Sequence, residues 1–151
     1  MNQQNTDVSS AEAILVINCG SSSVKFSLIQ ALSGETLLSG LAQCLLTQEA
    51  NITIKKTTDN ESHLKETLSL AAPFDHQSAL SVLVDKLSEY KLVAEIKAIG
   101  HRVVHGGENY AHPTLLNQEV EKTIAKLAKL APLHNPANLI GIQACKQAFA
   151  N

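Results

Sequence analysis

The sequence is poor in aromatic residues and in basic charge, and both shortages narrow the classes of function. No tryptophan occurs, and aromatic residues make up 3% of the 151 positions. Nucleic-acid-binding proteins usually combine stacking aromatic side chains with a basic surface. Here the formal net charge is −2 and the isoelectric point is about 6.3. We therefore expect no nucleic-acid partner.

Paired cysteines and long apolar runs are also missing. The three cysteines, Cys19, Cys44 and Cys145, form no C-x-x-C pair. An odd, scattered set is typical of reduced thiols in a cytosolic protein, and we expect all three to be small core residues. The first residues, MNQQNTDVSSAEA, contain neither a basic leader nor an apolar run. The sequence thus predicts no signal peptide, no membrane span, a cytoplasmic location and a flexible N-terminal extension over residues 1–12.

What the sequence does contain begins with a strand-rich part. Ile14–Ile17 is a continuous apolar run, which predicts a strand buried on both faces. Alternating residues over 24–29 predict a second strand, and a turn at 33–35 separates it from a third over 36–42. A fourth strand is predicted over 52–55, with an edge position as an option.

A helix-rich part follows a polar segment, residues 57–73, which we expect to be a connection. Apolar residues spaced by three and four over 80–90 predict a helix, with Asp75 or Ser78 as its N-cap. A short strand is predicted over 96–99.

Two more helices are expected near the end of the sequence. Apolar residues spaced as on one helix face follow Asn117, and Asn135-Pro136 reads as a cap residue followed by proline in the first turn. The lysines at 122, 126 and 129 would form a solvated face of the first of these helices.

The first candidate site is a polar hexapeptide between the first two strands. Asn18-Cys19-Gly20-Ser21-Ser22-Ser23 interrupts two apolar runs, and Lys25 follows on the second strand. Glycine allows close approach of a ligand, and successive amides and hydroxyls can surround an anion. The Walker A pattern is not met, because no second glycine precedes the lysine. An ordinary polar turn with a surface lysine is the alternative.

The second candidate site is the segment GHRVVHGGENY, residues 100–110. The planar guanidinium of Arg102 could hold a carboxylate or phosphate through two bonds, and a structural arginine paired with an acid is the alternative. His101 and His105 would share a face if the strand continued. Without thiolate or carboxylate partners we expect them to serve hydrogen bonding or the core rather than a metal.

The third segment is APLHNPAN, residues 131–138. Pro132 and Pro136 stiffen it and could hold Leu133 and His134 in a fixed direction. A turn between two helices explains the same residues equally well.

Together, three stretches resemble the acetate kinase family of short-chain acyl kinases. ILVINCGSSSVKFSLI, GHRVVHGGENY and LAPLHNPANLIGI are each close to motifs of that family and occur in its order. The resemblance implies an α/β fold of the actin, Hsp70 and sugar-kinase type, with a ribonuclease H-like mixed sheet and flanking helices. It also implies transfer of a phosphoryl group between ATP and acetate, giving acetyl phosphate and ADP, with Mg²⁺.

The resemblance assigns roles to individual residues. Asn18 matches an asparagine near the magnesium and the phosphates, and Lys25 matches a lysine assigned to ATP. The hairpin residues expected around the phosphates are Gly20, Ser21 and Ser22. Arg102 matches one of two arginines that hold the substrate carboxylate and the migrating phosphoryl group, and is the one catalytic residue expected within this sequence.

The acyl pocket and the remaining catalytic groups complete this expectation. Val104 and Leu133 match residues of the apolar pocket that receives the methyl group. The sequence stops before the family's FDTAFH-like stretch, so the catalytic aspartate and histidine, the second arginine, the adenosine loop and a magnesium-binding glutamate would lie beyond Asn151. Residues 13–151 would therefore form an incomplete N-terminal lobe without the C-terminal lobe.

Three functions follow from this expectation. The favoured one is an acetate kinase represented by its N-terminal part, inactive alone and dimeric when complete. A propionate or butyrate kinase is the second, and a noncatalytic binding remnant is the third.

Overall fold

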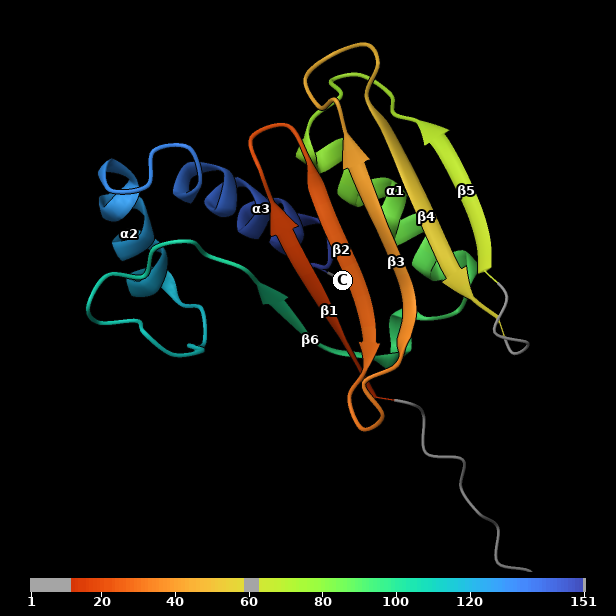
Figure 1. The fold of residues 1–151 in the computed structure, drawn as a ribbon, viewed down its shortest axis with the longest axis horizontal. Coiled ribbons are helices and arrows are strands. Elements are labelled where there is room, and N and C mark those ends of the chain that lie inside the picture. The colour runs from red at the N-terminus through yellow and green to blue at the C-terminus, as the bar shows by residue number, and fades with distance from the viewer. Residues whose placement is uncertain (1–11, 59–62, 151) are drawn as a thin grey trace, which may run out of the picture.

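A six-stranded mixed sheet organises the residues that the computed structural model describes, which are 12–58 and 63–150 (Figure 1). The strand order is β5-β4-β3-β2-β1-β6. Neighbours from β1 to β5 pair antiparallel, whereas β6 pairs parallel with β1. The strands are β1 (Ala13–Cys19), β2 (Val24–Gln30), β3 (Thr36–Gln43), β4 (Asn51–Thr57), β5 (His63–Ser69) and β6 (Ile96–His101).

Helices cover one face of this sheet. α1 (His76–Glu89) and α3 (Asn135–Ala148) pack against each other, and α3 also contacts β1 and β6. Both lie behind the sheet in the view of Figure 1, while α2 (Gln118–Lys126) lies to one side against α3. Short 3₁₀ turns precede β6 and follow α2, at Val93–Glu95 and Leu127–Lys129.

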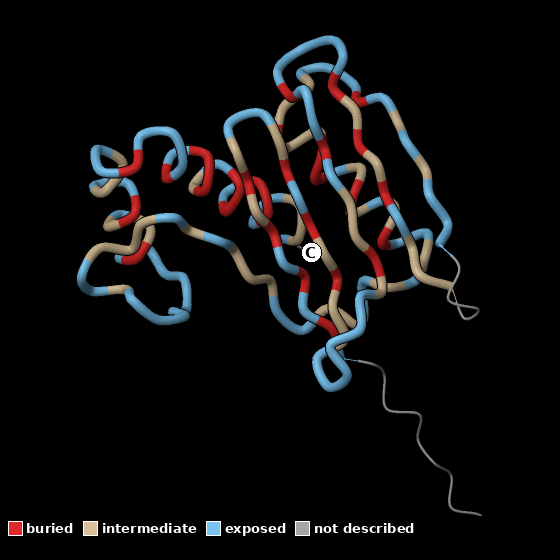
Figure 2. Tube along the Cα trace, viewed as in Figure 1, coloured by how far each residue is buried: buried red, intermediate tan, exposed pale blue. Residues whose placement is uncertain are grey.

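The core lies between the sheet and these two helices. Alternate residues of β1 to β4 are buried, as the banded strands of Figure 2 show. Side chains from α1 and α3 complete the cluster, whose fully buried large members include Leu15, Ile17, Phe26, Leu28, Leu80, Leu83 and Leu87. Phe26 lies against Gly40 of β3, where a Cβ atom would collide with its ring.

The expected burial of the first strand on both faces is wrong for the described residues. Ile14 and Val16 each keep 38% exposure, while Leu15 and Ile17 are buried. The reason is that α1 and α3 cover only one face of the sheet. A continuous apolar run does not show which of its faces is covered.

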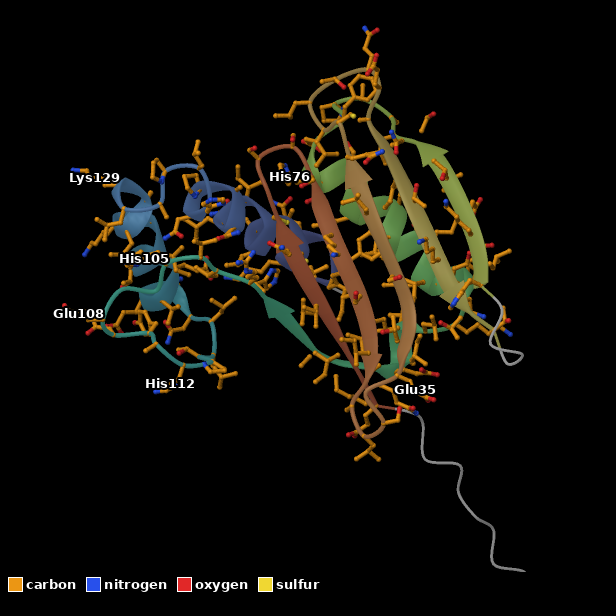
Figure 3. All side chains as sticks on the ribbon, in the orientation of Figure 1. Glu35, His76, His105, Glu108, His112 and Lys129 are labelled. Carbon is orange, nitrogen blue, oxygen red and sulfur yellow. The ribbon has the colours of Figure 1, made fainter. Side chains whose placement is uncertain are left out.

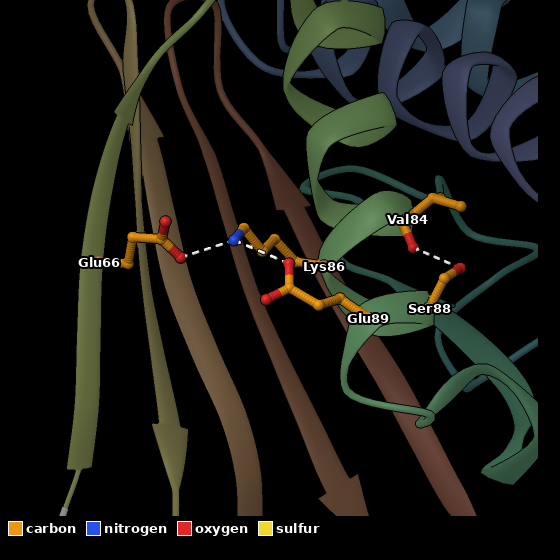
Figure 4. A network of polar contacts seen from close by, with 5 residues as sticks. All are labelled: Glu66, Val84, Lys86, Ser88 and Glu89. Atoms are coloured by element: carbon orange, nitrogen blue, oxygen red, sulfur yellow. Dashed lines mark hydrogen bonds and ion pairs between the residues drawn. The ribbon is translucent and has the colours of Figure 1, made fainter.

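The segment 57–73, expected to be a connection, contains a strand instead. β5 pairs with β4 over seven residue pairs, so β4 is not an edge strand. An edge strand can be polar because its side chains are largely exposed, and charged side chains there discourage pairing with another chain. Glu66 of β5 also forms an ion pair with Lys86 of α1 at 2.7 Å, and Glu89 pairs with the same ammonium group at 2.9 Å (Figure 4).

The helix caps agree with the sequence in two cases and differ in the third. Asp75 caps α1 by accepting from the Ser78 amide at 2.8 Å, and Asn117 caps α2 by accepting from the Val120 amide at 2.9 Å. In α3 the N-cap is His134, and Asn135 is already helical. The side chain of Asn135 is therefore free for other partners.

The cysteines separate into two kinds. Cys19 and Cys145 are buried and unpaired, and burial raises the pKa of their thiols to about 11 and about 12. Cys44 is exposed, so its expected place in the core is wrong. It follows β3 in a turn, where no layer covers it.

Two predictions concern the membrane and the N-terminus. None of the helices in residues 12–58 and 63–150 is long and apolar enough to span a membrane. The predicted extension, residues 1–12, lies outside the described residues except for Glu12.

Candidate functional site

Three predicted site residues stand in one row across three neighbouring strands. Asn18 of β1 pairs directly with Lys25 of β2. Ile17 pairs with His101 of β6, and the Arg102 amide donates to the Ile17 carbonyl at 3.0 Å. Arg102 therefore comes level with Asn18 on the next strand. Since adjacent strands lie about 4.8 Å apart, the order Lys25–Asn18–Arg102 spans only two strand spacings.

The hairpin between β1 and β2 leaves donors open to solvent. The Gly20 amide donates to the Ser23 carbonyl at 2.8 Å, which closes the turn. Ser21 and Ser22 at the tip are exposed, and no acceptor in the described part of the chain takes up their amides or hydroxyls. Such a run of free donors beside a lysine is suited to an anion.

Two buried side chains anchor the carbonyl groups of this hairpin. His76, at the start of α1 and 4% exposed, places Nε2 2.7 Å from the Gly20 carbonyl oxygen (Figure 3). Asn138 of α3 donates from Nδ2 to the Cys19 carbonyl at 2.9 Å. With both carbonyls held from behind, the amides at the tip stay directed to solvent.

Arg102 is exposed, and no acid pairs with it among residues 12–58 and 63–150. The same holds for Lys25. Nothing in the described chain thus supports the alternative of a structural arginine. Two unneutralised cations near the hairpin leave a local field that favours anions.

Two buried asparagines join the loop after β6 to α3, and sequence reasoning missed this role for both. Asn135 accepts from the His105 amide at 3.2 Å and donates to the His105 carbonyl at 3.0 Å. It also donates to the Ile124 carbonyl at 3.2 Å. Asn138 accepts from the Val104 amide at 3.1 Å. The signal in the sequence was two amides three residues apart in the first two turns of the helix, where the other residues are mostly apolar.

These bonds bring together the segments that carry Val104 and Leu133. Val104 precedes His105, and Leu133 lies two residues before Asn135. Val104 is 42% exposed and Leu133 is 76% exposed. Both are therefore apolar groups on an open surface, on neighbouring segments.

The histidines do not share a strand face, because β6 ends at His101. Partial burial lowers the pKa of His101. His105 lies in the following loop, where its Nδ1 accepts from the Gly107 amide at 3.0 Å (Figure 3). No group of three or more metal-binding side chains occurs in the described residues.

The cations border two separate hollows rather than one. A cavity of about 510 Å³ is bounded by the end of β6 with Arg102, the segment 110–116 and α2. A groove of about 320 Å³ on the uncovered sheet face contains Lys25 together with Lys55 and Lys65. Arg102 and Lys25 therefore line different hollows, and residues 20–23 of the hairpin line neither of the two.

Comparison with known proteins gives the family. The acetokinase family pattern matches residues 13–151. Acetate kinase 1 of Vibrio cholerae serotype O1 is 48% identical over 141 residues, which are 92% of this chain and 34% of that protein.

Solved structures give the fold. A propionate kinase from Francisella tularensis aligns with a TM-score of 0.82 at 38% identity, covering 93% of this chain and 35% of the other. Porphyromonas gingivalis acetate kinase aligns with a TM-score of 0.77 at 33% identity, covering 91% and 34%. The six-stranded sheet with its helices thus matches the N-terminal lobe of these kinases, as the resemblance predicted.

The chain spans about a third of the length of these relatives. By pattern, identity and fold, the chain belongs to the acetokinase family.

Proposed function

We propose that this chain provides the phosphate-binding hairpin and one substrate arginine of an ATP-dependent acetate kinase. The observation that carries the proposal is the row Lys25–Asn18–Arg102, which crosses three strands beside a hairpin with free amides. The reaction moves the terminal phosphoryl group of ATP to an oxygen of acetate, releasing ADP and forming acetyl phosphate.

The residues act through position and charge. The transition state of phosphoryl transfer spreads negative charge over oxygens, so preplaced donors and cations lower its free energy. Arg102 holds the acetate carboxylate and the transferring group with its planar fork, and Lys25 meets the nucleotide phosphates as a point charge. The amides of Ser21 and Ser22 donate to the same phosphates.

Magnesium is a partial fit to the described residues. Mg²⁺ is usually held by one or two carboxylates, water and substrate phosphates. Asn18 offers one amide oxygen in the row, and residues 12–58 and 63–150 contain no group of three or more metal-binding side chains to accompany it. Mg²⁺ bound with the nucleotide would neutralise phosphate charge, and Asn18 is the residue that would contact it from this chain.

The acyl group would contact Val104 and Leu133. Both are apolar and exposed, as expected for one wall of a pocket. The good structural match to a propionate kinase keeps propionate or butyrate as the second candidate substrate. One methylene in an apolar pocket changes discrimination by about 10- to 200-fold.

The test is a chimera in which residues 13–151 replace the matching third of the Vibrio cholerae acetate kinase 1. We expect turnover with acetate, measured as acetyl phosphate formed from ATP. Arg102→Ala should lower kcat/KM by about 10²- to 10³-fold, as loss of one transition-state donor does elsewhere. Arg102→Lys should recover little of it, because a point charge cannot replace the fork.

The matched control is Lys129→Ala, which removes an exposed cation from the 3₁₀ turn after α2. It should leave turnover unchanged. Assaying acetate, propionate and butyrate side by side identifies the substrate from the ratios of kcat/KM. Near-normal activity of Arg102→Ala in this chimera would contradict the proposal.

A further inference from the structure

We propose that Asn138 is a positioning residue that couples the phosphate-binding hairpin to the segment carrying Arg102 and Val104. The inference rests on the proposed function, because it assigns a task to a residue that touches neither nucleotide nor acetate. It concerns a single amide side chain on α3 with one partner on each side.

The first partner is the hairpin. Nδ2 of Asn138 donates to the Cys19 carbonyl at 2.9 Å, across 119 positions of sequence. Cys19 lies between Asn18, in the cationic row, and Gly20, whose amide closes the turn. Holding this carbonyl fixes the peptide plane from which the hairpin departs.

The second partner is the segment after β6. Oδ1 of Asn138 accepts from the Val104 amide at 3.1 Å. Arg102, two residues earlier, is bonded through its own amide to Ile17 of β1. The chain between these two bonds is thus fixed at both ends, which limits the directions that the Arg102 side chain can take.

The chemistry of an amide explains why asparagine stands here. Asn138 is 3% exposed, so an unsatisfied polar atom at this place would be costly. An amide offers a donor and an acceptor on two separate atoms of a group that stays neutral at every pH, so it can bond both segments at once. Aspartate lacks the donor, and leucine lacks both.

Asn138 is the shared link, whereas the neighbouring anchors serve one side each. His76 holds the Gly20 carbonyl from α1, and Asn135 holds the backbone of His105. Loss of Asn138 should therefore leave each segment attached to the fold and keep the bond from Arg102 to Ile17, but remove the link between the Cys19 carbonyl and the Val104 amide. Binding of a ligand at the hairpin would then no longer change the environment of the Val104 amide.

The experiment is a sulfate titration of the 151-residue chain followed by amide NMR signals. Sulfate keeps its charge between pH 4 and 8, so pH changes report on the protein. In the unaltered chain we expect the amides of Gly20, Ser21 and Ser22 to shift, and the Val104 amide to shift with the same apparent Kd.

Asn138→Asp keeps the acceptor for Val104 and removes the donor to Cys19. We expect sulfate affinity to fall about three- to tenfold, the range for one hydrogen bond, and the Val104 response to disappear. Lowering the pH should protonate the introduced carboxyl, restore a donor, and bring back both affinity and coupling. A purely structural role would show no such recovery.

Asn109→Asp is the matched control, because it makes the same chemical change at an exposed position. Amide exchange in β4 and β5 reports whether each variant is folded. If Asn138→Asp does not fold, Asn138→Ala replaces it, with loss of affinity and of coupling expected and no recovery at low pH.

Unchanged sulfate affinity and an unchanged Val104 response in a folded Asn138 variant would overturn the inference while leaving the hairpin site intact. Absence of any sulfate shift at residues 20–22 in the unaltered chain would overturn the phosphate site itself. The two failures are therefore distinguishable.

Discussion

At the scale of single residues, the site divides into exposed cations and buried amides. Lys25 and Arg102 are exposed and unpaired by acids in the described chain, whereas Asn135 and Asn138 are buried and hydrogen-bonded through both amide atoms. The charged side chains are thus accessible to a ligand, and the neutral amides fix the backbone of the segments that carry them. This division avoids the cost of burying an unpaired charge.

His101 gives a prediction about pH at this scale. Burial lowers its pKa below the usual 6.5, so the unfolded chain binds a proton more readily than the folded one. Its contribution to stability is therefore present above about pH 6.5 and is lost as the pH falls toward the lowered folded-state value. We expect the free energy of unfolding, from urea titration, to decrease between pH 7.5 and 5.5.

His101→Gln should flatten that decrease, since glutamine does not titrate. The control is His112→Gln, which removes an exposed histidine from the loop before α2 (Figure 3). It should keep the slope of the unaltered chain. Equal slopes for all three proteins would show that His101 binds its proton as easily in the folded state.

At the scale of elements, α3 is the part that assembles the site. It packs on α1, β1, β6 and α2, and it supplies both asparagines. Its approach to β1 depends on Gly141, where an added Cβ would collide with the side chain of Cys19. The absence of a Cβ atom at Gly141 therefore allows α3 to lie this close to β1.

Gly141→Ala tests this contact. Alanine favours a helix over glycine by about 1 kcal/mol, yet forcing atoms into a packed core costs about 1–3 kcal/mol. The contact with Cys19 involves a β-strand in the core, which cannot move freely. We expect a net loss of up to about 2 kcal/mol in the free energy of unfolding, together with altered NMR shifts in the hairpin.

Gly100→Ala is the matched control, because an added Cβ there has no neighbour within 4 Å. It should not destabilise the protein comparably. A Gly141→Ala protein as stable as the unaltered chain would mean that α3 has room to move away from β1.

At the scale of the whole molecule, α1 and α3 cover one face of the sheet in the described residues and leave the other face open. The uncovered sheet face keeps Ile14 and Val16 partly exposed. Leu115, which lines the same cavity as Arg102, is 91% exposed, and Leu133 is 76% exposed. Apolar surface of this kind favours association with another protein surface.

The isolated 151-residue polypeptide tests the noncatalytic alternative. We expect weak binding of ATP at the hairpin, no measurable acetyl phosphate from ATP, Mg²⁺ and acetate, and self-association through the exposed apolar side chains. One side of a cleft cannot exclude water or hold both ends of the transfer. Mass in solution and a coupled assay provide the readouts.

A monodisperse monomer with robust turnover would contradict this expectation, because the needed groups would then all lie within these residues. Inactivity that persists in the chimera with the acetate kinase would favour a noncatalytic binding module instead. Activity in the chimera alone would support the kinase.

Local patterns in the sequence determined a large part of the fold. Alternation placed β2, the cap residues Asp75 and Asn117 located the starts of two helices, and the polar hexapeptide gave the hairpin. Each of these features depends on residues within a few positions of each other, so the sequence shows it directly. The motif around Arg102 likewise placed that residue just after β6.

Only the tertiary structure decided which distant groups meet. The covered face of β1, the pairing of β5 as an edge strand and the bond from Asn138 to Cys19 all depend on how elements pack across the sheet. Local rules favour Asn135 as a helix cap, but in the packed structure its side-chain amide bonds the backbone of His105 instead. Long-range contacts of this kind leave no periodic trace in the sequence, because their partners are selected by the geometry of the folded chain.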